Sequence, residues 1–391
     1  MVKALSRTLF LLQRVRYSFE SGKLLRPCRG LAQGHYFSNC SLPETMKAIM
    51  IRDFGNEDVL NVSTVPRKTN TPEEILIRVE AAGINPVDTY LREGFFAQLP
   101  PLPLILGKEV AGTVAAIGSN VTHNPYNLKV GDRVYCMLPN NGGYAQYVAS
   151  IPENVIPLPD KLTYSQGACL YVTYYTAYRA LILRAKMKRN ETVLIHGASG
   201  GVGTAAIQLA KHYGAFVAAT AGSDAGIELC KSLGADYTIN HRRDDHLQVA
   251  KRELGDRGFD IIFENVAHVF LGEDGHVLAP EGRIAIVGCK GSIEIAPRTL
   301  MVSEGAMIGV SLFLMTPENM DEGTRVILQG IEDGWIKPVI EKEYTIHEAR
   351  QAHHDMQKKA GKLGKLVFKV DHDSSCRTRT LIKQRRLAED L

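Results

Sequence analysis

The spacing of apolar and polar residues divides the chain into stretches of different fold. From Met46 onward, short alternating segments rich in β-branched residues are separated by Gly and Pro, which predicts a mostly β domain. The strands expected there span residues 47–51, 74–81, 110–117, 132–137 and 144–148. Helical spacing then takes over at about residues 165–183.

Strands and helices alternate regularly in the next part of the chain. The expected strands are 192–196, 216–220, 237–239, 259–264 and 283–288, with helices at 202–213 and 225–233 between them. Short links of this kind join parallel strands through right-handed crossovers, so the pattern predicts an α/β fold with a doubly wound, Rossmann-type sheet. The last expected elements are helices at 321–333 and 346–358 and strands at 342–344 and 365–370.

These patterns predict two domains, as the length of 391 residues also does. We expect a mostly β domain from residues 46–167, a cofactor-binding domain from residues 168–315, and a return to the first domain over residues 316–370. Residues 371–391 carry little apolar content and are expected to form a disordered tail.

The first 45 residues have a composition of their own. Lys and Arg are frequent there, Glu20 and Glu44 are the acids, and Leu5 and residues 9–12 give an apolar stripe. A basic, amphipathic start that contains Ser is typical of a mitochondrial presequence. The alternative is a disordered leader before a working start at Met46, which would leave the protein in the cytoplasm.

Composition excludes several classes of protein. With 45% hydrophobic and 23% charged residues the chain is typical of a globular protein, and a net charge of +4 is too small to predict nucleic-acid binding by itself. The seven cysteines are scattered without a CxxC pair, which argues against a disulfide framework and a structural zinc lobe. No apolar run is long enough to cross a bilayer.

A glycine-rich segment follows the expected strand at 192–196. Residues 198–203 read A-x-G-x-x-G and lead into an expected helix. Small residues let the chain turn sharply, let its backbone approach a pyrophosphate, and let the helix pack on its strand. Because the motif stands between a strand and a helix of a β-α-β unit, it predicts dinucleotide binding.

The end of the second strand of this unit selects the dinucleotide. An NAD site places an acidic residue there for the ribose hydroxyl, but here the strand leads into Ala221, Gly222 and Ser223. Asp224 is better placed to start the next helix. Without an acid to repel a 2′-phosphate, NADPH is the expected cofactor, with Ser223 and His241 as possible donors.

Several further motifs occur in a fixed order between Met46 and about Val370. They are residues 83–90, 142–145, 175–181, 196–203, 240–242, 287–291, 309–312 and 335–340. Together they resemble the ζ-crystallin-like NADPH:quinone oxidoreductases, a zinc-free branch of the medium-chain dehydrogenase/reductase superfamily. The resemblance implies a GroES-like catalytic domain joined to a Rossmann domain, and a homodimer or homotetramer.

The resemblance also implies a set of cofactor contacts. They are Tyr90, Thr176, Ser199, Gly200, Gly201, Val202, Gly222, His241, Val287, Gly288, Cys289, Lys290, Val310, Ser311 and Leu312. One position departs from the family, because Phe270 stands where the family has an asparagine that contacts the cofactor.

The positions of the catalytic zinc in zinc-dependent relatives carry other residues here. Those relatives use a Cys in the segment that matches 82–88 and a His in a G-H-E motif, where this chain has Asn85 and Lys108. Asparagine is a poor zinc ligand and lysine is none at neutral pH, so no metal is expected. A cofactor that reduces an electron-poor acceptor needs no Lewis acid, which favours quinones or activated alkenes as substrates.

Tyr90 is the candidate proton donor to the acceptor oxygen, with Asn85 beside it, although Tyr90 could equally serve packing or cofactor contact. Cys289 is expected to be a buried small residue, and His353 and His354 are expected at the surface.

Two other functions stay open at this point. An enoyl-thioester or alkenal reductase shares the expected fold and cofactor. Binding of AU-rich RNA, with which ζ-crystallin-like proteins are associated, would use a basic patch made of Arg242, Arg243, Lys251 and Arg252.

Overall fold

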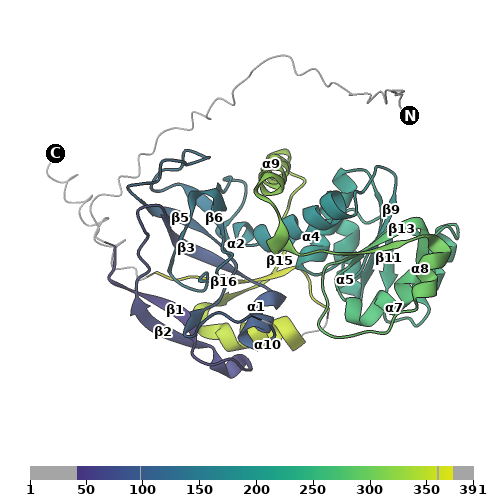
Figure 1. Cartoon of the computed structure of the whole chain (residues 1–391), viewed down its shortest axis with the longest axis horizontal. Helices are drawn as coiled ribbons and strands as arrows, with labels where there is room; N and C mark the ends of the chain where they lie inside the picture. Colours follow the sequence, from purple (N-terminus) through teal and green to yellow (C-terminus); the bar gives the residue numbers. More distant parts are fainter. Residues whose placement is uncertain (1–41, 97, 359–360, 373–391) are drawn as a thin grey trace, which may run out of the picture. The chain divides into compact units, whose positions relative to one another are not determined.

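The computed structural model describes residues 42–96, 98–358 and 361–372 (Figure 1). The predicted presequence lies almost entirely outside the described residues, and so does the predicted C-terminal tail. No helix in the described ranges combines the length and apolar character needed to cross a membrane.

The first part of the chain, together with its last two strands, forms two β-sheets. The smaller has the strand order β2-β1-β4 and the larger has the order β15-β16-β3-β5-β6-β8, with β7 also paired to β3. Their strands are β1 (Thr45–Ile51), β2 (Asn61–Pro66), β3 (Ile75–Ile84), β4 (Leu104–Ile105), β5 (Glu109–Ile117), β6 (Arg133–Met137), β7 (Tyr147–Ser150), β8 (Val155–Pro157), β15 (Ile340–Thr345) and β16 (Lys365–Lys369). Because β16 pairs antiparallel with β3, the last strands of the chain lie beside strands formed near its beginning (Figure 1).

The middle of the chain forms a six-stranded parallel sheet of order β11-β10-β9-β12-β13-β14. Its strands are β9 (Thr192–Ile195), β10 (Phe216–Ala221), β11 (Tyr237–Asn240), β12 (Phe259–Glu264), β13 (Leu278–Ile286) and β14 (Ala306–Gly309). The α/β fold class is confirmed.

Helices cover both faces of this parallel sheet. Side chains of a strand alternate between its faces, so Val193 and Ile195 join one apolar cluster and Leu194 joins another. The first cluster includes residues of α4 and α5, and the second includes residues of α6 and α7. The longer helices are α4 (Gly201–His212), α5 (Asp224–Ser232), α6 (His246–Glu253), α7 (Ala267–Val277), α8 (Pro297–Ser303), α9 (Pro317–Asp333) and α10 (Ala349–Lys358), with α1 (Pro86–Arg92), α2 (Tyr164–Gly167) and α3 (Thr176–Tyr178) before them.

The stretch predicted as one helix at 165–183 is irregular. It contains two π-helical segments, η3 (Tyr171–Tyr175) and η4 (Arg179–Arg184), on either side of α3. Its tyrosines pack in the core, where the hydroxyl groups of Tyr135 and Tyr175 lie 2.9 Å apart. The remaining short helices are the 3-10 turns η1 (Glu57–Val59), η2 (Pro152–Asn154), η5 (Leu312–Leu314) and η6 (Ile346–Glu348).

Candidate active site and cofactor loop

The glycine loop turns out of β9 and opens α4, as its sequence predicts. Gly197 has a φ of +59°, a conformation that suits glycine, and Gly200 is the N-cap of α4. Because Gly200 has no side chain to cap the helix, the first amides of α4 stay available to an anion at the positive end of the helix dipole.

The second element of the cofactor site is the end of β10. Ser223 caps α5, since its Oγ accepts a hydrogen bond of 3.2 Å from the Gly226 amide, and Asp224 begins that helix as expected. A Cβ built on Gly222 would lie 2.5 Å from Nε2 of His241, so the His241 ring fits against a glycine here. The cradle has no carboxylate at the strand end and has an imidazole beside it, which fits a 2′-phosphate.

The third element is the pair of segments that follow β13 and β14. The amide of Val287 donates to the Glu264 carbonyl at 2.8 Å, and the amide of Val310 donates to the Ile286 carbonyl at 2.9 Å. A Cβ on Gly288 would lie 2.3 Å from the Asn265 carbonyl oxygen, so this close approach requires glycine. These contacts bring Val287 and Val310 to the ends of adjacent strands, with Ser311 and Leu312 following.

The expectation that Cys289 is buried is wrong, because its side chain is exposed. The strand β13 ends at Ile286, and the chain then leaves the sheet, which takes Cys289 out of the apolar layers. Its Sγ contacts the Gly291 carbonyl at 3.0 Å.

Tyr90 lies on α1, where its ring faces Lys290 from the segment that follows β13 of the parallel sheet. The Lys290 ammonium is 5.7 Å from the centre of its ring, and the Phe95 ring centre is 6.3 Å away. Burial raises the pKa of Tyr90, and Cys289 and Glu93 act in the same direction. The hydroxyl therefore keeps its proton at neutral pH and can donate a hydrogen bond.

Asn85 is buried at the N-terminus of α1, and its side-chain amide is already engaged. Its Nδ2 donates to Oε1 of Glu109 at 3.1 Å, and its Oδ1 accepts from Nζ of Lys365 at 2.5 Å. In the same way Lys108 is buried and donates to the Pro139 carbonyl at 2.6 Å. Because the nitrogen atoms of Asn85 and Lys108 donate hydrogens here, these two side chains do not fit a zinc ion.

Known protein families match both sheet-forming parts of this chain. A model of the alcohol dehydrogenase GroES-like domain matches residues 71–160, and a model of zinc-binding dehydrogenases matches residues 201–328. The quinone oxidoreductase of Rattus norvegicus is 42% identical over 324 residues, which cover 83% of this chain and 97% of the relative. The chain belongs to the quinone oxidoreductase family.

Solved structures resemble this quinone oxidoreductase family member throughout its folded part. A mycobacterial protein in complex with NADPH is 28% identical, with a TM-score of 0.77, and the match covers 83% of this chain and all of the other. The CurK enoyl reductase is 27% identical with a TM-score of 0.76, covering 84% of this chain and 100% of the other. The chain is thus similar both to a quinone oxidoreductase and to an enoyl reductase, the two enzyme classes that the sequence left open.

Predicted cofactor residues of this oxidoreductase lie on several elements. The residues from Ser199 to Val202 form the loop and the first turn of α4, and Thr176 begins α3, which packs on α4. A Cβ on Gly201 would touch Thr173 and Lys365 at 3.1–3.3 Å. The individual contacts to NADPH stay predictions.

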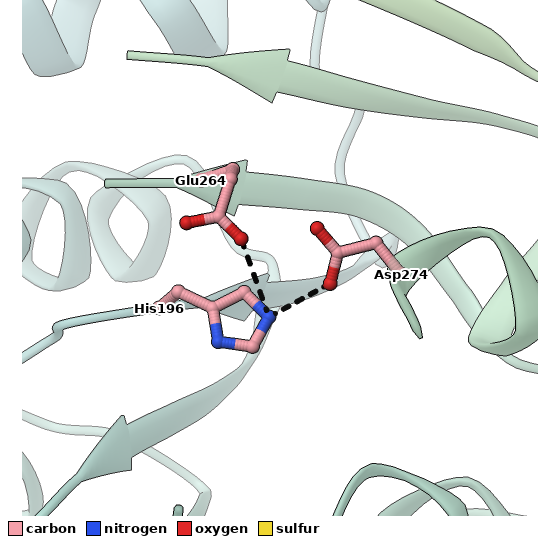
Figure 2. A group of neighbouring side chains, drawn as sticks. All are labelled: His196, Glu264 and Asp274. Atoms are coloured by element: carbon pink, nitrogen blue, oxygen red, sulfur yellow. Dashed lines mark hydrogen bonds and ion pairs between the residues drawn. The ribbon is translucent and has the colours of Figure 1, made fainter. Parts of the chain in front are cut away.

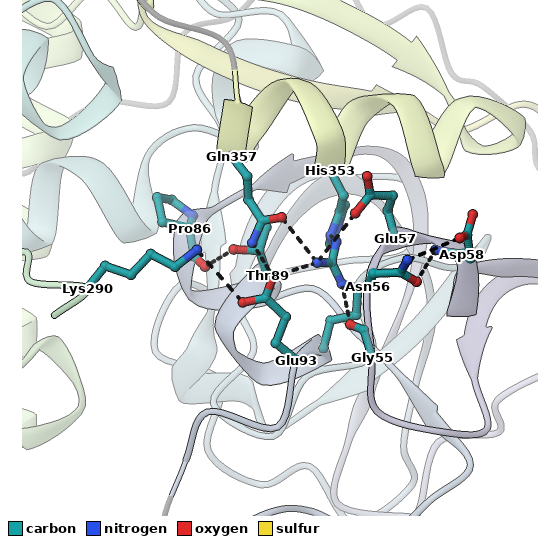
Figure 3. A network of polar contacts seen from close by, with 11 residues as sticks. Gly55, Asn56, Glu57, Asp58, Pro86, Thr89, Glu93, Lys290, His353 and Gln357 are labelled. Atoms are coloured by element: carbon teal, nitrogen blue, oxygen red, sulfur yellow. Dashed lines mark hydrogen bonds and ion pairs between the residues drawn. The ribbon is translucent and has the colours of Figure 1, made fainter.

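A polar network with Arg92 and His353 buried within it runs from this cofactor side to α10 (Figure 3). Lys290 Nζ lies 3.9 Å from Glu93, and Glu93 is bound at 2.9 Å by the buried Arg92, which also contacts Nδ1 of His353 at 3.3 Å. The expectation that His353 is exposed is wrong, whereas His354 lies at the surface. Burial lowers the pKa of His353 to about 3, with Arg92 acting in the same direction, so its ring is neutral.

The spacing of residues in α10 already indicated that His353 is buried. Ala349, Ala352, His353 and Met356 recur at intervals of three and four residues, and all four are buried. A histidine within such a stripe is expected to face the core with it.

A second buried group, next to the glycine loop, was not anticipated. His196, Glu264 and Asp274 are fully buried, and their ligand-type atoms lie within 4.8 Å of one another (Figure 2). Nε2 of His196 and Oδ1 of Asp274 lie 3.0 Å apart and form a hydrogen bond. Burial raises the pKa of Glu264 to about 8 and that of Asp274 to about 7, so we interpret the group as a set of side chains that share protons.

Phe270 explains part of this arrangement. Its ring stacks on the His196 ring at 4.7 Å and lies 5.7 Å from the His241 ring. The His246 ring lies 5.5 Å from it, so the position that holds a cofactor-binding asparagine in the family packs here against three histidines.

Proposed function

We propose that this chain reduces quinones with NADPH and without zinc. The observation that carries the proposal is the glycine cradle, in which the end of β10 has no carboxylate and Gly222 lies beside the His241 ring, in a chain 42% identical to a quinone oxidoreductase. NADPH, when bound, supplies the hydride equivalent. The protein binds the cofactor, orients the acceptor and holds a proton at the Tyr90 hydroxyl.

Initial rates with two acceptors and two cofactors test this function. We expect 9,10-phenanthrenequinone to be reduced in preference to crotonyl-CoA, and NADPH to be used about 10- to 100-fold better than NADH, because a charge-assisted hydrogen bond to the 2′-phosphate contributes about 1.5–3 kcal/mol. Equal use of both cofactors would contradict the assignment of the cradle. Preference for crotonyl-CoA would favour the second candidate, an enoyl-thioester reductase, which the likeness to the CurK enoyl reductase supports.

Replacing Tyr90 with phenylalanine tests the proton donor. The variant should lower kcat for quinone by about 100-fold, because a positioned general acid contributes 10²-fold or more, and should leave NADPH affinity little changed. Stopped-flow oxidation of NADPH measures the first effect and fluorescence titration the second. Tyr237→Phe, in β11, is the matched control and should keep wild-type kcat. A Tyr90→Phe enzyme with wild-type kcat would leave the tyrosine a packing role.

We also propose self-association, as a homodimer or homotetramer. Strand β14 ends the order of the parallel sheet, and the nearby helix α8 exposes Met301 and Val302 by 75% and 80%. An open strand edge beside exposed apolar side chains suits pairing with a second copy. Light scattering of the purified protein would give the mass, and a monomer at micromolar concentration would contradict this.

RNA binding and mitochondrial import stay predictions. Within the basic patch, Lys251 donates to the His276 carbonyl and Arg252 lies 4.0 Å from Asp245, so part of its charge is engaged.

A further inference from the structure

The residue of interest is Lys365, the first residue of β16, which no sequence motif singled out. Its side chain is buried, and its ammonium lies 2.7 Å from Oε1 of Glu109, 2.5 Å from Oδ1 of Asn85 and 2.9 Å from the Ile84 carbonyl oxygen. These three acceptors use all three hydrogens of the ammonium. A fixed positive charge thus lies against the two segments that carry the zinc ligands in zinc-dependent relatives.

Three side chains form a closed triangle around this charge. Lys365 binds both Asn85 and Glu109, and Nδ2 of Asn85 donates to the same Glu109 oxygen that the ammonium contacts. The ammonium requires the amide oxygen of Asn85 to face it, and the carboxylate requires the amide nitrogen to face the other way. The orientation of the Asn85 side chain is therefore determined by its partners.

Asn85 in turn fixes the start of α1. It is the N-cap of this helix, and its backbone amide donates to Oδ2 of Asp88 at 2.9 Å. Tyr90 lies two residues further along the same short helix. These contacts belong to the Asn85 backbone, so a displacement of the whole residue would shift the start of the helix that carries the proposed proton donor.

The stem of the Lys365 side chain, at Cδ, lies beside the cofactor loop. A Cβ on Gly201 would lie 3.1 Å from Cδ of Lys365, and the amide of Gly364 donates to the Ser199 carbonyl at 2.7 Å. One side chain therefore contacts both the glycine loop and the N-cap of α1.

We propose that Lys365 is a positioning residue for reduction of the acceptor. Its stem packs on the loop that binds NADPH, and its ammonium holds Asn85 at the start of the α1 helix, so one side chain contacts both the cofactor loop and the residue that begins the helix of Tyr90. This inference rests on the proposed function, in that NADPH is the electron donor. A simpler alternative is that Lys365 only neutralises the buried carboxylate of Glu109, as a buried ion pair often does without adding function.

Two variants of the full chain separate these roles. Lys365→Met keeps the stem and removes the charge, and we expect it to lower the single-turnover rate of NADPH oxidation by about 10- to 100-fold, because a displacement of about 1 Å can cost that much. The Kd for NADPH should change by less than about threefold, since each tenfold change requires 1.4 kcal/mol and the loop keeps its packing. Lys365→Met/Glu109→Gln also removes the unpaired carboxylate.

The double variant decides between positioning and charge neutralisation. It should regain the thermal stability that Lys365→Met loses and should keep the slow rate, because Asn85 is still released. Recovery of the wild-type rate by the double variant would overturn the proposal, and so would a wild-type rate in Lys365→Met. If Lys365→Met fails to fold, the double variant carries the test alone.

Lys211→Met is the control for loss of a lysine charge. Lys211 forms an ion pair of 2.7 Å with Asp236 in the parallel-sheet domain, and Lys211→Met should keep the wild-type rate. The rate is measured with the acceptor that the wild-type protein reduces best, quinone or enoyl thioester. Failure of the quinone assignment is then visible in the wild type and does not affect the comparison of the variants.

Discussion

Replacing Gly203 with alanine is expected to abolish measurable NADPH binding and to destabilise the folded chain. A Cβ at this position would lie 2.4 Å from the Gly197 carbonyl oxygen and 2.6 Å from Cα of Ala198. Both contacts are with backbone, so α4 would have to move away from the loop that it closes. Alanine normally stabilises a helix by up to about 1 kcal/mol relative to glycine, and an overlap of this size outweighs that gain.

Gly200 provides the matched comparison within the same loop. Its φ of −81° is open to alanine, and the nearest atom to an added Cβ would be 3.4 Å away, an ordinary contact. We therefore expect Gly200→Ala to keep the wild-type Tm and to weaken NADPH binding, since the backbone must approach the pyrophosphate closely there.

Calorimetric titration with NADPH and thermal unfolding measure the two effects separately. Gly203→Ala should lose both affinity and Tm, and Gly200→Ala should lose affinity alone. An alanine at 203 that preserves both would contradict the packing described for this turn.

The parts of the site that the sequence predicted are those built from local spacing. The glycine loop, the strand before it and the helix after it occupy consecutive residues, and Gly200 and Gly203 both face the Gly197 carbonyl oxygen a few positions away. The same holds for Asp224, whose place at the first turn of α5 follows from the Ser223 cap just before it.

The parts that were missed depend on contacts between distant residues. Lys365 and Asn85 are 280 positions apart, and Arg92 and His353 are 261 apart. Nothing near Lys365 in the sequence distinguishes it from a surface lysine, because its acceptors come from β3 and β5 through the pairing of β16 with β3.

Closeness in sequence to a buried strand did not predict the burial of the residues that follow it. Cys289 follows a buried strand by three residues and is exposed, because the strand ends at Ile286. The tyrosine-rich helix fitted a 3.6-residue period well enough to be predicted as one helix, yet its turns are partly π-helical. A wider turn changes the period only slightly over five or six residues, so the apolar pattern could not resolve it.

Glu264 belongs to the buried group beside the cofactor loop, and its replacement should change how stability depends on pH. We expect Glu264→Gln to become more stable relative to wild type as the pH rises from 6 to 8. The folded chain holds a proton on Glu264 up to a pKa of about 8, whereas the unfolded chain releases it near the ordinary value of 4.5. The folded state therefore binds more protons in this range, and the stability of the wild type falls as the pH increases.

The size of the effect follows from the linkage between proton binding and folding. Each pH unit well below the folded pKa changes the contribution of one such carboxyl by about 1.4 kcal/mol, and the slope falls to half at the pKa itself. The advantage of the glutamine should therefore grow by roughly 2 kcal/mol between pH 6 and 8. Glutamine also suits the site, since one oxygen of Glu264 accepts from the Val266 amide and the other is free of a hydrogen-bond partner in the described part of the chain. The amide nitrogen would occupy that second position and face Asp274.

Urea denaturation at pH 6, 7 and 8 measures this difference, with Glu228→Gln as the control. Glu228 lies on α5 with 70% of its side chain exposed, so its neutralisation should produce a difference that does not change with pH. A constant difference for Glu264→Gln as well would mean that Glu264 is ionised in the folded protein. The buried group would then need a positive partner, and a doubly protonated His196 would be the candidate, because its Nε2 lies 3.8 Å from the carboxylate. The stability from such an ion pair would already be present above the ordinary pKa of the acid. A difference that changes between pH 6 and 8 therefore indicates a protonated Glu264, and a constant difference indicates an ionised one.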